Sequence, residues 1–116
     1  MECYFRISLF CSHMNRIEQL QQFLEKSPND TFLNHAMALE YVKMEEDENA
    51  RKYFEKNLAN DARYVATYYH LGKLLERLNI TAEAIIIYES GMAIAKSVGD
   101  QHSYNELQGA YEDLVY

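Results

Sequence analysis

The chain has 116 residues, of which 48% are hydrophobic and 25% charged, so it is long enough for one domain with its own core. Its formal net charge of -7 disfavours nucleic acid and anionic membrane surfaces as partners, because their phosphate groups repel an acidic domain. One proline and four glycines supply too few turn-forming residues for a many-stranded β fold, so the composition favours helices.

Cys3 and Cys11 are the two cysteines, and both stand near the N-terminus. Two cysteines are too few for a disulfide framework or for a zinc site of four such ligands, which indicates a reduced, cytoplasmic protein. The apolar stretch around them is broken by Arg6 and is too short to cross a bilayer. Two interpretations of residues 1–13 stay open: an extension upstream of a true start at Met14, or a short apolar cap over the first helix.

Apolar residues recur at helical spacing along the rest of the chain, and they predict six helices joined by short turns. The predicted helices cover about 15–26, 31–44, 48–59, 64–78, 82–97 and 101–115. No segment shows the polar and apolar alternation of a strand, so the sequence predicts an all-α fold. The helix over 82–97 is apolar on most of its surface, which predicts that it is buried between neighbours.

The turns carry residues that typically start or end a helix. The predicted N-terminal caps are Asp30 or Asn29, then Asp47, Thr81 and Asp100. Asn79 and Gly99 are predicted to take the left-handed conformation that closes a helix. These signals set the predicted helix boundaries.

The helices repeat with a period of 34 residues, because residues of the same size class recur at that offset. Stepping back by the same offset from Phe54 reaches Leu20, which extends the pattern to the first helix. The matching pairs include Ala38 with Gly72, Ala50 with Ala84, Phe54 with Tyr88, and Leu58 with Met92.

This pattern resembles the tetratricopeptide repeat (TPR) family, whose 34-residue repeat is a pair of antiparallel helices. The family's large and small positions are held within 65–98 by Tyr68, Leu71, Gly72, Leu75, Ala84, Tyr88 and Gly91. Within 31–64 they are held by Met37, Ala38, Tyr41, Ala50, Phe54 and Ala62. Three residues depart from the pattern: Asn34, Asn57, and Lys96 where proline is usual.

The resemblance implies one TPR-like domain over residues 14–116, built as a right-handed superhelix of antiparallel helix pairs. Its parts are a half repeat at 14–30, repeats at 31–64 and 65–98, and a C-terminal capping helix at 99–116. Gln108 stands where a small residue is usual, which indicates that nothing packs beyond the last helix.

Gly72 lies at the centre of a predicted helix, where glycine costs roughly 1 kcal/mol relative to alanine. The repeat pattern explains it, because two paired helices cross at this position and a large side chain would hold them apart. The sequence therefore predicts that a large residue at position 72 unfolds the array, whereas alanine is tolerated or even stabilising.

Chemistry-bearing motifs are absent from the sequence. His35, His70 and His102 have no His, Cys or Asp four residues later, so no helix carries a ready pair of metal ligands. There is no nucleophile elbow, no phosphate-binding glycine loop and no C-x-x-C motif. The sequence predicts no metal site, no cofactor and no catalytic activity.

In the TPR family the first helix of each pair lines a concave groove, so the resemblance implies a protein-interaction module that binds a protein or peptide segment. Tyr69 is the predicted anchor. The implied partner-binding residues are Phe32, His35, Leu39, Lys43, Tyr69, Lys73, Glu76 and Arg77.

Two other functions are alternatives to this one. Some TPR domains hold the C-terminal carboxylate of chaperones with a lysine and asparagine clamp, but His35, Leu39 and His70 stand at those places here. The remaining alternative is a structural protein that buries the open ends of its array in a homodimer.

Overall fold

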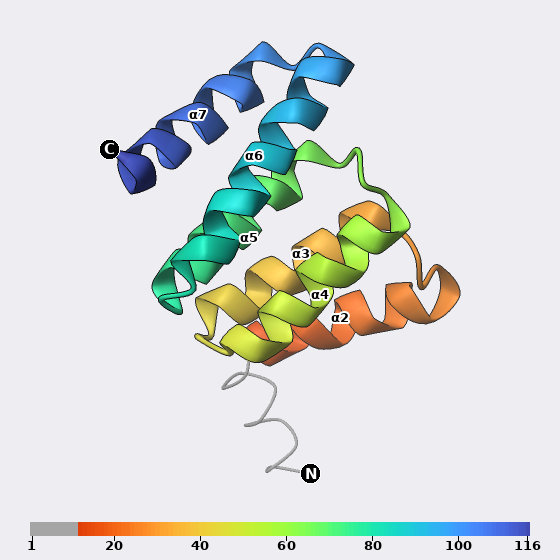
Figure 1. Ribbon diagram of the computed structural model, residues 1–116. Coiled ribbons are helices and arrows are strands. Elements are labelled where there is room, and N and C mark those ends of the chain that lie inside the picture. Colours follow the sequence, from red (N-terminus) through yellow and green to blue (C-terminus); the bar gives the residue numbers. More distant parts are fainter. Residues whose placement is uncertain (1–11) are drawn as a thin grey trace, which may run out of the picture.

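The computed structural model describes residues 12–116, which form a row of antiparallel helices (Figure 1). The helices are α2 (Ser12–Lys26), α3 (Thr31–Lys43), α4 (Asp47–Asn60), α5 (Val65–Arg77), α6 (Thr81–Val98) and α7 (Gln101–Val115). The prediction of six helices in an all-α fold is confirmed for this part of the chain, with every end within three residues of its expected place. Residues 1–11 lie outside the described part, so both interpretations of the N-terminal segment stay predictions.

Consecutive helices pack as hairpins, and the hairpins pack side by side. The pairs α3 with α4 and α5 with α6 have the most extensive contacts, while α2 packs on α3 and α7 packs on α6. Contacts of α4 with α5 join the two hairpins. As Figure 1 shows, α2 and α7 therefore stand at the two ends of the row.

Three turns behave as the sequence predicts. The Asp30 carboxylate accepts from the Leu33 backbone N–H at 2.9 Å, and Asp100 accepts from the Ser103 N–H at 3.1 Å. Asn79 and Gly99 have φ of 62° and 78°, in the left-handed region. Local chemistry alone fixes these four residues, which is why the sequence is sufficient to predict them.

The predicted caps Asp47 and Thr81 are wrong, because these residues are the first of their helices. The carboxylate of Asp47 pairs with Arg77 of α5 instead. Ile80 precedes α6 and packs against the core, so an apolar contact occupies the cap position there.

The expectation that the apolar helix α6 is buried between neighbours holds for only part of its surface. The helix packs on α5 and α7, and the side of it that faces neither remains in solvent. Ile86 on that side is 58% exposed. Some apolar residues of α6 therefore pack in the core, whereas others lie at the surface of the molecule.

Two glycines allow α5 and α6 to lie close together. The ring of Tyr88, which is fully buried on α6, lies on the backbone of α5 at Gly72. In the opposite direction, Tyr68 of α5 lies against Gly91 of α6. Each helix therefore receives a tyrosine from the other at a position without a side chain, which confirms the predicted close crossing at Gly72.

The α3–α4 hairpin uses different residues at the equivalent positions. Ala38 and Phe54 replace Gly72 and Tyr88, and both are fully buried. Asn34 and Asn57 stand where the second hairpin has Tyr68 and Gly91, and both are also fully buried. The Asn34 amide donates to the carbonyl oxygens of Pro28 at 3.1 Å and Asp30 at 2.9 Å, so this departure from the family pattern secures the start of α3.

The prediction that alanine is tolerated at position 72 is contradicted by the packing. A Cβ at this position would lie 2.6 Å from Tyr88 Cζ and 2.7 Å from Tyr88 Cδ1, closer than carbon atoms approach. The Tyr88 ring is fully enclosed, so relief requires the two helices to separate.

Gly72→Ala should therefore lower the free energy of unfolding, by about 1–3 kcal/mol, as overpacked cores do. Urea unfolding followed by circular dichroism measures the change. Gly109→Ala in α7 is the matched control, because a Cβ there meets no atom within 4 Å. It should be neutral or stabilise by up to about 1 kcal/mol. Equal stabilisation by both substitutions would contradict the packing argument.

Candidate functional site

The inner helices α3, α5 and α7 form one side of the molecule, and two small hollows lie along it. The hollow between α3 and α5 has a volume of about 100 Å³ and is lined by Val42, His70, Lys73, Leu74 and Arg77. The hollow between α5 and α7 has a volume of about 190 Å³ and is lined by Val65, Ala66, Tyr69, His70, Ser103, Glu106 and Leu107. We call this side, with its two hollows, the groove.

Three of the predicted binding residues line the groove hollows: Tyr69, Lys73 and Arg77. They lie on one face of α5, since residues three and four apart are neighbours on a helix. The Lys73 ammonium lies 5.9 Å from the centre of the Tyr69 ring, within the range of a cation–π contact. An aromatic side chain and a cation are thereby held next to each other at the surface.

The other charged residues of the predicted set are held by partners within the chain. Glu76 accepts a hydrogen bond from the buried Tyr88 hydroxyl and lies 3.8 Å from the Lys73 ammonium. Burial, followed by this carboxylate, raises the pKa of Tyr88, which therefore stays protonated and donates. Lys43 pairs with the buried Glu40 at 3.3 Å. These contacts fix where the charges of the groove stand.

His35 lies at the junction of the two hairpins, where only 8% of its surface is exposed. Its Nδ1 is 2.9 Å from Thr67 Oγ1, and the Asn57 amide donates to the same oxygen at 3.0 Å. The His70 ring lies 5.3 Å away, centre to centre. The structure therefore places His35 in a buried contact among α3, α4 and α5, with little surface left for a partner.

Phe32 and Leu39 complete the predicted set, and neither lines a hollow of the groove. Phe32 is 65% exposed, while Leu39 is half-buried against the core.

His70, Ser103 and Glu106 also line the groove, although they are not among the predicted partner-binding residues. His70 directly follows Tyr69. Because one face of a helix is wide enough to include neighbouring residues, the groove-facing side of α5 could have been expected to include His70.

With the longer connection that the family pattern requires before α7, the sequence places His102 and Asn105 of this helix at groove positions. The α7 residues that line the hollow, Ser103 and Glu106, are the next residues along the chain.

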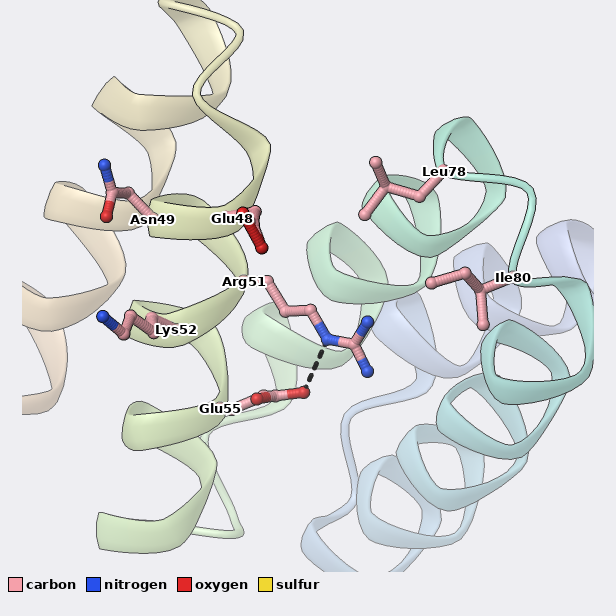
Figure 2. Close-up of a pocket in the computed structure, with 7 residues that line it drawn as sticks. All are labelled: Glu48, Asn49, Arg51, Lys52, Glu55, Leu78 and Ile80. Atoms are coloured by element: carbon pink, nitrogen blue, oxygen red, sulfur yellow. Dashed lines mark hydrogen bonds and ion pairs between the residues drawn. The ribbon is translucent and has the colours of Figure 1, made fainter.

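A separate pair of hollows lies on the outer side of the molecule, between α4 and α6; Figure 2 shows the larger one. It has a volume of about 640 Å³ and is lined by Glu48, Asn49, Arg51, Lys52, Glu55, Leu78 and Ile80. The smaller one, of about 260 Å³, is lined by Arg51, Glu55, Leu58, Leu71, Leu75, Glu83, Ile86 and Ile87. We call the two together the α4–α6 trough; it contains none of the predicted site residues.

Arg51 stands where the two hollows of the trough meet. Its Nε donates to Glu55 at 2.8 Å, and its Nη2 donates to Glu83 of α6 at 2.6 Å. The side chain thus bridges α4 and α6 across the trough.

Within residues 12–116, no three His, Cys, Asp or Glu side chains gather as they would around a metal ion. None of the helices described there is long and apolar enough to cross a membrane.

Comparison with known proteins identifies the class of the chain. Neither the family sequence models nor the curated proteins give a match. Solved structures give matches. One is a tetratricopeptide repeat domain protein from Salinibacter ruber, which is 41% identical in sequence; the match covers 73% of this chain and 94% of that one, with a TM-score of 0.70. A protein from Bordetella parapertussis is 30% identical over 84% of this chain and 85% of its own, with a TM-score of 0.74.

The antiparallel pairs, the 34-residue period and the inner groove define a helical-repeat protein. The chain belongs to the tetratricopeptide repeat family. Its fold is the predicted right-handed superhelix, and it also resembles the TPR2B domain of yeast Sti1, with a TM-score of 0.82 over 94% of this chain and 87% of that one. At 15% identity this last likeness concerns the fold alone.

The buried histidine predicts a pH dependence of stability. Burial, and then the nearby His70, lowers the pKa of His35 from 6.5 to about 4. The folded state therefore binds fewer protons than the unfolded state between these values, so stability falls as the pH drops from 6.5 towards 4. The loss attributable to His35 should be about 3 kcal/mol in total.

His35→Gln should flatten this part of the profile, measured as urea midpoints at a series of pH values. Burial also lowers the pKa of His70, so part of the slope remains in the variant. His102→Gln is the control, because the His102 side chain is 86% exposed. Parallel profiles for the wild type and His35→Gln would show that His35 is not the titrating group.

Proposed function

We propose that this TPR protein is a non-catalytic interaction module that binds a protein or peptide segment in the groove. The observation that carries the proposal is the α5 face on which Tyr69, Lys73 and Arg77 border two adjacent hollows. An aromatic ring and an Arg side chain are the residue types that most often dominate binding energy. Two hollows that share His70 can receive two neighbouring side chains of one segment.

The cations of the groove can exchange their partners. Arg77 pairs with Asp47, and Lys73 lies near Glu76, but the Lys73 and Arg77 side chains are 47% and 43% exposed. Exposed pairs of this kind contribute roughly 0–1 kcal/mol each. A bound segment can therefore take over these charges at small cost.

Related structures and composition support the same proposal. The Sti1 TPR2B domain, which shares the fold, was solved as a complex with pHsp70. The proposed unit is the single domain over residues 14–116, with its half repeat, two repeats and capping helix. A cytoplasmic location is proposed from the cysteine usage.

Self-association is the second candidate function, and the exposed aromatic residues at the N-terminal end of the row favour it. Phe23 of α2 and Phe32 of α3 are 59% and 65% exposed. Apolar side chains of this size are the kind that a second copy would cover. Sedimentation velocity over a range of concentrations tests the idea, and a strict monomer would exclude it.

Tyr69→Ala combined with Lys73→Glu should reduce retention of protein partners at least tenfold, because it removes the anchor and reverses one charge of the groove. Affinity capture with the full chain, quantified by mass spectrometry, measures the effect. The matched control is Tyr116→Ala with Lys96→Glu, which makes the same chemical changes at exposed sites outside the groove. If both double variants retain the same partners as the wild type, the groove is not the binding surface.

A further inference from the structure

The α4–α6 trough lies behind the groove, on the other side of α5. Leu71 and Leu75 of α5 and Leu78, which follows α5, border the trough, whereas Tyr69 and Lys73 border the groove. The two surfaces share no lining residue, so an occupant of the trough is a different partner contact from the one proposed for the groove.

Apolar side chains form the bottom and one side of the trough. Leu71 and Leu75 at its bottom are only 1% and 2% exposed, so they belong to the core as well. Leu58 and Ile87 are half-buried beside them, and Ile86 at the rim is 58% exposed. An aliphatic side chain placed here would extend the core and remove Ile86 from water.

The rim of the trough is acidic. Three carboxylates border it, those of Glu48, Glu55 and Glu83, and the Arg51 guanidinium lies between the last two. Figure 2 shows the Arg51 side chain pointing across the trough, while the Lys52 ammonium points away from Leu78 and Ile80. Carboxylates therefore outnumber cations at the rim, and basic side chains are the complementary partners.

The length of the trough suits a short helix. Its lining follows α4 from Glu48 to Leu58, a span of about 15 Å at the helical rise. The Arg51 bridge crosses this span, but the Arg51 and Glu83 side chains are 30% and 51% exposed, and such surface pairs contribute little free energy. The bridge can therefore turn aside without disturbing the core.

We infer that the α4–α6 trough docks an amphipathic helix of a protein partner, with aliphatic side chains over Leu71 and Leu75 and lysine or arginine side chains at the acidic rim. Helices bind such channels through an apolar stripe, and the flanking charges set their orientation. The excess of carboxylates at the same rim disfavours an acidic helix.

The experiment is a titration of the full chain, labelled with ¹⁵N, with a synthetic amphipathic helix of leucine and lysine about three turns long. The expected result is that the amide chemical shifts of Leu58, Leu75 and Ile86 change on addition of the peptide, and that these changes become smaller when salt is added. The same peptide with glutamate in place of lysine should cause none. Equal effects of the two peptides, or shifts confined to Tyr69 and Lys73 of the groove, would overturn the inference.

Ile86→Ser tests the apolar contact without threatening the fold, because Ile86 is largely exposed. It should weaken binding of the leucine–lysine helix about tenfold, the effect of withdrawing one aliphatic side chain from an interface. Val98→Ser is the matched control, an exposed aliphatic residue at the far end of the same helix, and should bind as the wild type does.

Tyr69→Ala separates this inference from the groove proposal. This variant should bind the leucine–lysine helix unchanged even where it loses groove partners. An unchanged affinity in Ile86→Ser, or a loss in Tyr69→Ala, would show that the helix does not occupy the trough.

Discussion

The contact between Gly72 and the Tyr88 ring determines much of the rest of the structure. Because the ring lies directly on the α5 backbone, α6 approaches α5 more closely than any side chain at position 72 would permit. The Tyr88 hydroxyl then reaches Glu76, one turn further along α5, and holds its carboxylate near the groove residue Lys73. One missing Cβ thus fixes both the spacing of the hairpin and the position of a charge on its inner surface.

The first hairpin reaches similar packing with different chemistry. Where the second hairpin has the large Tyr68 and the side-chain-free Gly91, the first hairpin has two side chains of medium size, Asn34 and Asn57. The side-chain oxygen of each asparagine has no hydrogen-bond partner among the described residues. A buried acceptor without a partner costs about 1–3 kcal/mol. Asn57 nevertheless donates to Thr67, which also bonds His35. The first hairpin therefore has a polar link to the next one through Thr67.

The 34-residue period was sufficient to predict the helices, the hairpins and the crossing at Gly72, because repeated packing requires repeated residue size. It could not predict that a methyl group at position 72 would meet the Tyr88 ring, since that depends on ring orientation and not on size class. Nor could it predict the burial of His35, whose partner Thr67 lies 32 residues away. The sequence pattern thus identified the helix faces that point to the groove, whereas tertiary contacts decide which residues on those faces remain exposed to a partner.

Helix α5 separates the groove from the α4–α6 trough. Tyr69 and Lys73 project to one side, while Leu71 and Leu75 project to the other and are almost fully buried. Protein interiors are close-packed, so α5 cannot move towards either surface without opening its contact with α6. The Tyr88 ring, enclosed between the helices, resists that movement. The wall that α5 contributes to each surface is therefore fixed, so a segment of the proposed kind would meet it without the entropic cost of ordering that wall.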